Sequence, residues 1–103
     1  MHPVVSRHLD QLGPLCAKHG VRRLALFGSA ATGSFDPETS DLDVLAEFTP
    51  VPPARHADNY FGLLADLEQL FGVAIDLVEP GPLRNPYFRQ AIEATQVVLF
   101  EAA

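Results

Sequence analysis

Apolar residues near the start of the chain predict a helix with a break in it. Within residues 4–19 the apolar side chains recur every three or four positions: Val5, Leu9, Leu12 and Cys16. Gly20 follows and is suited to end a helix. Pro14 interrupts the pattern, because proline lacks an amide hydrogen and clashes with the turn before it. We therefore expect a kinked helix, or two short helices that meet at Gly13-Pro14.

Two of the stretches that follow have strand patterns of different kinds. Residues 22–27 end in a continuous apolar run, which is typical of a strand buried on both faces. Residues 42–48 alternate instead, and their apolar face consists of Leu42, Val44, Ala46 and Phe48. The opposite face is unusual because it carries the carboxylates of Asp41, Asp43 and Glu47. Residues 33–40, between the two strands, have the composition of a loop.

The second half of the chain predicts two more helices and two more strands. Residues 54–71, closed by Gly72, have the helical apolar positions Ala57, Tyr60, Phe61, Leu64, Leu67 and Phe71. A strand is expected at 73–79 and another at 97–100, with a short helix between them that Asn85 caps. The fold class is therefore α/β (α+β), with a mixed sheet of about four strands and helices packed on it. We expect residues 1–103 to form a single domain.

Composition and charge narrow the function. The chain has 103 residues, is 48% hydrophobic and has a net charge of -6, without a run of Lys and Arg. Long nucleic acids are disfavoured as partners of this chain alone, whereas metal ions can neutralise the phosphates of a small nucleotide. A single cysteine, Cys16, excludes an intrachain disulfide and is expected in the core. No apolar stretch approaches the roughly 20 residues that span a bilayer, so we expect a cytoplasmic protein and no membrane. The four histidines are expected at the surface: His2, His8, His19 and His56.

Three aspartates are the candidates for chemistry. Asp41 and Asp43 are two positions apart on a strand, so their carboxylates point to the same face and can converge on one centre. Repulsion of roughly 3 kcal/mol between two such charges is relieved by protonation or by a cation. Oxygen ligands without His or Cys favour magnesium or manganese over zinc. Asp76 interrupts the later apolar strand and joins the pair if the two strands are neighbours, and three carboxylates can hold two metal ions.

A glycine and a serine supply the shape of a phosphate cradle. Gly28 follows the first strand and lets the backbone approach a ligand closely. Ser29 follows, where a short helix can begin with its free amides toward an anion, and its hydroxyl can bond a terminal phosphate. The segment lacks the Gly-Lys-Ser/Thr end of a Walker loop, which excludes that class of nucleotide site. An Asp-x-Asp pair alone is usually a solvated face, so its combination with Gly28, Ser29 and Asp76 carries the hypothesis.

These motifs resemble those of a known superfamily. Leu26-Phe27-Gly28-Ser29, followed after eleven residues by Asp41-Leu42-Asp43, is similar to the signature of the DNA polymerase beta-like nucleotidyltransferases. Ile75-Asp76-Leu77-Val78 fits the third metal ligand of that signature. The whole chain looks like the minimal nucleotidyltransferases (MNT) that act as antitoxins beside HEPN ribonuclease toxins, and the resemblance extends through Leu83-Arg84-Asn85-Pro86.

The resemblance implies an activity, cofactors and a partner. It implies a magnesium-dependent protein adenylyltransferase that holds two Mg²⁺ ions on Asp41, Asp43 and Asp76 and binds ATP at Gly28 and Ser29. AMP would pass to a hydroxyl, in this subgroup a tyrosine of the HEPN toxin, with Asp76 deprotonating or positioning the acceptor oxygen. The chain would then be the antitoxin of a type VII-like pair.

One departure from the family leaves an alternative open. Many members carry arginine where this chain has Ala30 or Thr32. Arg22, Arg23, Arg84 or Arg89 is then the possible source of a cation for the triphosphate. The other possibility is a catalytically weak or inactive antitoxin, which neutralises its partner by binding alone.

Overall fold

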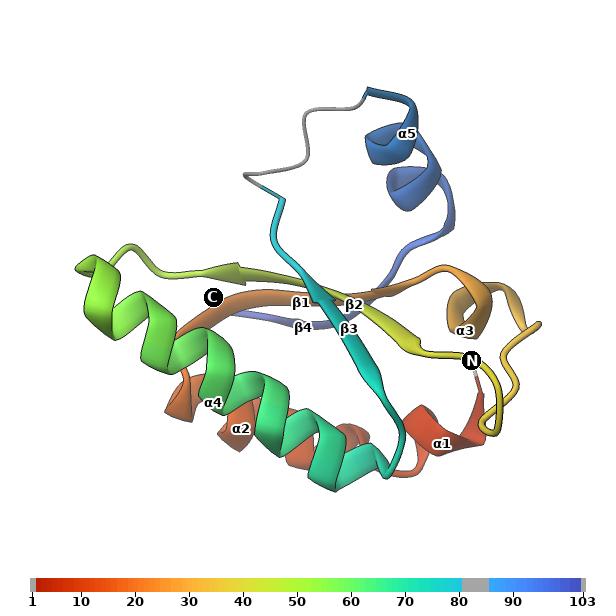
Figure 1. The fold of residues 1–103 in the computed structure, drawn as a ribbon, viewed down its shortest axis with the longest axis horizontal. Coiled ribbons are helices and arrows are strands. Elements are labelled where there is room, and N and C mark those ends of the chain that lie inside the picture. The colour runs from red at the N-terminus through yellow and green to blue at the C-terminus, as the bar shows by residue number, and fades with distance from the viewer. Residues whose placement is uncertain (1, 81–85, 103) are drawn as a thin grey trace.

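A four-stranded mixed sheet forms the centre of the computed structural model, which describes residues 2–80 and 86–102. Its elements in chain order are α1 (Pro3–Ser6), a 3₁₀ helix (Leu9–Gln11), α2 (Leu12–Lys18), β1 (Val21–Phe27), α3 (Ser29–Thr32), β2 (Leu42–Phe48), α4 (Pro53–Phe71), β3 (Ile75–Val78), α5 (Pro86–Thr95) and β4 (Val97–Glu101). The strand order is β3-β2-β1-β4. β1 runs antiparallel to both β2 and β4, whereas β2 and β3 are parallel (Figure 1). The predicted fold class is confirmed.

One face of the sheet carries the main hydrophobic core. Leu42, Val44 and Ala46 of β2 are fully buried, as their alternation predicts. Figure 1 shows α2 and α4 on this side of the sheet, and their buried residues include Leu12, Cys16, Leu63, Leu67 and Phe71. Burial raises the pKa of the Cys16 thiol to about 11. The predicted core position of this cysteine is thereby confirmed, and its thiol stays protonated at neutral pH.

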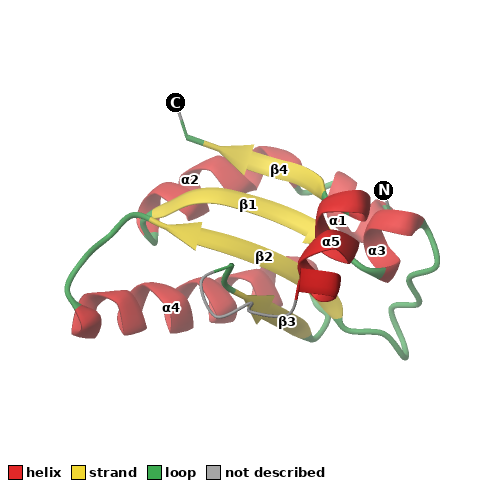
Figure 2. Ribbon diagram, turned by 90° about the horizontal axis from the view of Figure 1, so that it is seen from above, coloured by secondary structure: helices red, strands yellow, loops and turns green. Residues whose placement is uncertain are grey.

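The opposite face of the sheet is covered only in part, by α5. Ile92 of α5 is 3% exposed and forms a small second cluster with Ala25, Phe27 and Leu45. Figure 2, viewed from this side, shows α5 lying across one end of the strands and leaving the remaining part of β1 and β2 open. Because odd-numbered residues of β2 face this side, Asp43 and Glu47 also point to it.

The N-terminal helix breaks at a different place from the one predicted. Its interruption lies between α1 and the 3₁₀ helix, at residues 7–8, and not at Gly13-Pro14. Pro14 is the third residue of α2. A first turn has no intrahelical partner for its amide hydrogens, so proline costs little there. The asparagine predicted to cap α5, Asn85, lies outside the described residues.

Two side chains, one just after α2 and one on α4, correct the predicted burial. His19 is buried, against the expectation of a surface histidine, and its Nε2 lies 2.6 Å from Oδ2 of Asp66. A Cβ atom at Gly62 would lie 2.7 Å from Cε1 of His19, so the missing side chain of this glycine makes room for the ring. Phe61, expected in the core, is 64% exposed, because α4 turns Leu63 and Leu67 inward instead.

The pair formed by His19 and Asp66 gives a prediction on stability. The hydrogen bond from His19, then that from Lys18, lowers the pKa of Asp66 below its usual value of 3.8. A lowered pKa adds stability that is present above pH 4 and disappears as acid protonates the folded carboxylate. Asp66→Ala should lower the free energy of unfolding at pH 7 by about 1–3 kcal/mol, because His19 loses its partner. Urea unfolding should show a weaker dependence on acid pH than in the unaltered chain. Glu68→Ala, on the exposed side of the same helix, is the matched control, and an equal loss in both variants would contradict the assignment.

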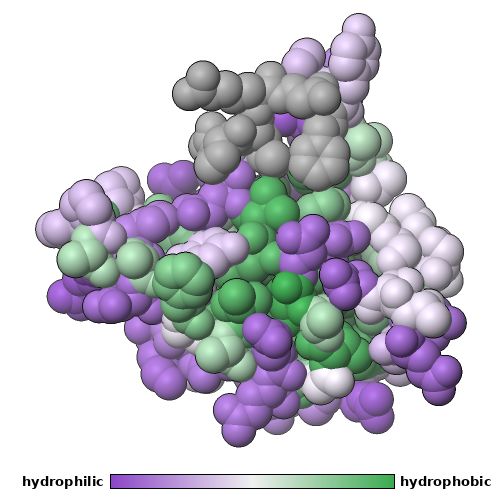
Figure 3. All heavy atoms as spheres, viewed as in Figure 1, coloured by the Kyte–Doolittle hydropathy of each residue, from purple (hydrophilic) through white to green (hydrophobic). Residues whose placement is uncertain are grey.

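The surface toward the viewer of Figure 1 is mixed in polarity. Figure 3 shows hydrophobic side chains in the middle of this surface with hydrophilic residues around them. β3 is an edge strand here, and Ile75 and Val78 are partly exposed. None of the helices within residues 2–80 and 86–102 has the length and apolar content needed to cross a membrane.

Candidate active site

Gly28 has a backbone conformation that depends on glycine. It ends β1 with φ 69° and ψ -147°, a region that other residues essentially do not occupy. A Cβ atom added here would overlap with Oδ2 of Asp43. The carboxylate of Asp43 therefore packs directly on the backbone where the chain turns from β1 into α3. The predicted short helix begins at Ser29, as expected.

Asp43 and Asp76 are direct neighbours in the sheet. β2 and β3 pair Asp43 with Asp76, and β1 places Phe27 on the other side of Asp43. Residues paired across neighbouring strands point to the same face, so both carboxylates face the side of the sheet that α5 partly covers. Burial raises the pKa of Asp43, and the neighbouring charges of Asp76 and then Asp41 raise it further. A site that disfavours its own negative charge is suited to a cation.

A hollow of about 500 Å³, here called the Asp43 hollow, lies over these carboxylates. Its volume is within the range of about 300–1,000 Å³ typical of small-molecule sites. The strand ends and α3 contribute Phe27, Gly28, Ser29, Thr32, Asp43 and Asp76. Ser34 and three residues of α5, Ala91, Ile92 and Thr95, complete the lining. Two carboxylates thus share a ligand-sized space with the glycine-serine turn.

The lining from α5 was not predicted. The sequence offers no chemical signal for Ala91 and Ile92, which have the ordinary composition of a packed helix. Thr95 is a hydroxyl that could have been noticed, and it donates to the carbonyl of Ala91 at 2.9 Å. α5 reaches this hollow because of the way the chain crosses the sheet. The spacing of apolar residues along the sequence does not show where the chain crosses.

Asp41 differs from the other two aspartates in its position at the edge of the site. It precedes β2, is exposed, and does not line the Asp43 hollow, although its charge contributes to the raised pKa of Asp43. Among the described residues no three His, Cys, Asp or Glu side chains are grouped closely enough to hold a metal ion. Magnesium in nucleotide sites is commonly held by one or two carboxylates together with substrate phosphates and water. Asp43 and Asp76, two hard oxygen donors with mutually unfavourable charge, fit that kind of site.

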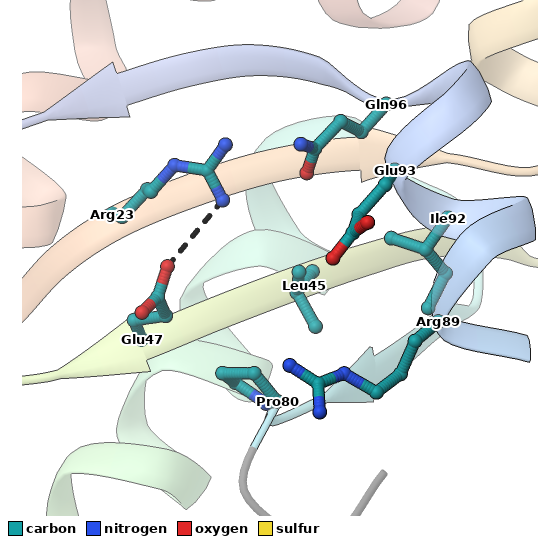
Figure 4. A pocket seen from close by; sticks show the side chains of 8 residues that line it. All are labelled: Arg23, Leu45, Glu47, Pro80, Arg89, Ile92, Glu93 and Gln96. Carbon is teal, nitrogen blue, oxygen red and sulfur yellow. Dashed lines mark hydrogen bonds and ion pairs between the residues drawn. The ribbon is translucent and has the colours of Figure 1, made fainter. Parts of the chain in front are cut away.

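The arginines considered as phosphate ligands lie elsewhere. Arg22 and Arg23 form ion pairs with Glu47 at 3.2 and 3.4 Å. Arg89 lines a second hollow together with Arg23 and Glu47 (Figure 4). Arg84 is outside the described residues. Within residues 2–80 and 86–102, therefore, no arginine or lysine lines the Asp43 hollow.

The sequence matches a family and a curated relative. A family model described as nucleotidyltransferase domain matches residues 10–98. A protein of Methanocaldococcus jannaschii named as a protein adenylyltransferase is 38% identical over 76 residues, which are 74% of this chain and 74% of that protein. The match to the family includes every residue singled out in the site.

Solved structures share the fold. A minimal nucleotidyltransferase superposes with a TM-score of 0.65 at 33% identity, over 88% of each chain. A toxin-antitoxin structure with AMP-PNP gives 0.64 at 18% identity, over 91% of this chain and 73% of the other. A complex of tri-AMPylated Shewanella oneidensis HEPN toxin with MNT antitoxin gives 0.58 at 16% identity, over 93% and 71%. At such low identity the two complexes support similarity of fold alone.

Proposed function

Because this chain belongs to the nucleotidyltransferase domain family, we propose that it transfers AMP from ATP to a hydroxyl of a partner protein. The observation that carries the proposal is the Asp43 hollow, where Asp43 and Asp76 face the same space as Gly28 and Ser29. The partner proposed is a HEPN toxin and the acceptor a tyrosine, with this chain as the antitoxin. Support comes from the relative named as a protein adenylyltransferase and from the related fold found with an AMPylated HEPN toxin.

Each side chain has a proposed role in this transfer. The backbone at Gly28 and the hydroxyl of Ser29 would hold the terminal phosphates. The carboxylates of Asp41, Asp43 and Asp76 would hold two magnesium ions, whose charge stabilises the leaving pyrophosphate. Asp41 lies outside the hollow, so it would take part only by helping to hold the magnesium that the nucleotide also binds. Asp76, the carboxylate farthest from Gly28 in the strand order, would have a second role, which is to accept the proton of the acceptor hydroxyl.

The bonds change in a single displacement. The acceptor oxygen forms a bond to the α-phosphorus of ATP, and the bond from this phosphorus to the oxygen that bridges to the β-phosphate breaks. Pyrophosphate leaves with that electron pair, and the hydroxyl proton passes to Asp76. The attacking and leaving oxygens lie roughly in line in such transfers.

Intact mass spectrometry of the partner tests the proposal. A HEPN protein is co-expressed with the unaltered chain and with Asp41→Asn/Asp43→Asn. We expect a mass gain in multiples of AMP with the unaltered chain and none with the double variant. Asp36→Asn/Asp58→Asn, two exposed carboxylates away from the hollow, should transfer normally. An unmodified partner with magnesium and with manganese would contradict the proposed activity.

The alternative is an antitoxin that acts by binding alone. Ala30 and Thr32 in place of arginine, and a hollow without a described cation, favour this reading. It predicts that the partner stays unmodified in a stable complex and that Asp41→Asn/Asp43→Asn still protects cells from the toxin. Loss of protection in that variant, with the complex intact, would contradict it.

A further inference from the structure

Another hollow lies on the same sheet face as the Asp43 hollow. Here called the Arg23 hollow, it lies between the strands and α5 and has a volume of about 190 Å³. Leu45, Pro80 and Ile92 provide its apolar surface, and Arg23, Glu47 and Glu93 are among its charged residues (Figure 4). Ile92 of α5 lines both hollows, so they adjoin at this side chain.

The two hollows follow one another along the strands. Ser29 and Gly28 are at the end of β1, and Asp43 and Asp76 form the next row of the sheet. Leu45 pairs with Ala25 one row farther on, and Glu47 with Arg23 in the row after that. Two residues advance a strand by roughly 7 Å. The floor of the Arg23 hollow thus begins one row beyond the carboxylates, on the side away from Ser29.

The size of the Arg23 hollow limits its occupant. Small-molecule sites usually have about 300–1,000 Å³, and the Asp43 hollow falls within that range. The Arg23 hollow, at about 190 Å³, is below that range. It has room for one side chain of a larger molecule, which can rest on Leu45 and Ile92.

The charges around this hollow fit a polypeptide. Arg23 forms an ion pair with Glu47, with 3.4 Å between its guanidinium nitrogen and the carboxylate oxygen. Arg89 and Glu93 of α5 are exposed and form no ion pair with another described residue. Figure 4 shows them extending from α5 toward Pro80 and Leu45. Unpaired within the described part of the chain, these two side chains and the nearby amide of Gln96 offer donors and acceptors to a chain that carries both kinds of group.

We infer that the Arg23 hollow is the acceptor subsite, which receives the polypeptide segment that carries the hydroxyl, with Arg89 and Glu93 as its positioning residues. The inference rests on the proposed function. Pyrophosphate leaves toward Gly28 and Ser29, so an in-line attack brings the acceptor oxygen from the opposite side of Asp43. The Arg23 hollow is the described cavity on that side of the carboxylates. Its occupant is therefore a protein segment rather than a second part of the nucleotide.

Kinetics with two substrates separate these roles. Arg89→Gln/Glu93→Gln is compared with Arg55→Gln/Glu68→Gln, whose exposed side chains on α4 line neither hollow. The acceptor is the co-expressed HEPN protein, and the nucleotide probe is AMP-PNP measured by calorimetry without acceptor. We expect the KM for the HEPN protein to rise at least fivefold in the α5 variant, with the Kd for AMP-PNP changed less than twofold. The control variant should change neither constant.

Each contrary result has its own meaning. A weaker Kd for AMP-PNP with an unchanged KM for the HEPN protein would overturn the inference and assign the hollow to the nucleotide. Unchanged values of both constants would overturn it as well, while leaving the transfer activity in place. Absence of transfer by the unaltered chain would instead overturn the proposed function, and the acceptor subsite with it.

Discussion

Gly28→Ala should reduce AMP transfer by at least about 100-fold, because a displacement of about 1 Å at a reacting group is enough for such a loss. The added Cβ would overlap with Oδ2 of Asp43, so the carboxylate has to leave its position against the backbone. The backbone of the variant would also be strained, since φ 69° with ψ -147° is a conformation that glycine adopts and alanine does not. Strain of this kind costs about 1–3 kcal/mol. Transfer rates and thermal unfolding of the same preparation measure the two effects separately.

Two other glycines provide controls for that variant. Gly33 and Gly72 also have positive φ, but nothing lies within 4 Å of a Cβ atom at either position. Gly33→Ala and Gly72→Ala should therefore lose about 1–2 kcal/mol of stability and keep their transfer rate when folded. Transfer by folded Gly28→Ala at the rate of these controls would show that Asp43 does not need its contact with Gly28.

The family and the fold could be predicted because their signals are local. Alternation in residues 42–48 follows directly from the two faces of a strand, and the buried residues agree with it. The family predicted from Gly28-Ser29 and Asp41-Leu42-Asp43 is confirmed by the match over residues 10–98. The spacing of residues along one or two helices or strands is therefore sufficient to predict both the fold and the family.

Features that depend on contacts between distant elements were not predictable in this way. His19 is buried because Gly62, on another helix, leaves space for its ring. The helix was expected to break at Pro14 because the sequence does not show that this proline lies in the first turn of α2. The strand expected at 73–79 is shorter, Ile75–Val78, although the carbonyl of Ala74 still accepts a hydrogen bond from the amide of Leu42 in β2.

The site residues also differ in how well the sequence predicted their positions. Asp43 and Asp76 were expected to meet if their strands were neighbours, and their register pairs them directly. Asp41 was expected with them; it lies just before β2, exposed and outside the hollow, although its charge still acts on Asp43. Its metal role stays a prediction, as do those of Asp43, Asp76, Gly28 and Ser29.

Asp43→Asn should make the metal-free protein more stable while removing its activity. Burial and the charges of Asp76 and Asp41 raise the pKa of Asp43, which means that the fold disfavours its ionised form. At pH 7 the ionised carboxylate therefore destabilises the folded state, and the neutral amide of asparagine relieves that repulsion. We expect a gain of about 0.5–1 kcal/mol, comparable to other single stabilising changes. Thermal unfolding in EDTA measures it.

Transfer should change in the opposite direction. Loss of the electrostatic stabilisation of a reacting group typically costs about 100-fold or more, so Asp43→Asn, which weakens the proposed magnesium site, should be nearly inactive. Asp58→Asn, an exposed carboxylate of α4, should alter neither stability nor transfer. A destabilised Asp43→Asn would mean that Asp43 has a structural role, for example as a hydrogen-bond acceptor beside Gly28. The opposite signs of the two effects identify a residue kept for what it binds, since a carboxylate that weakens its own fold has no structural reason to be charged.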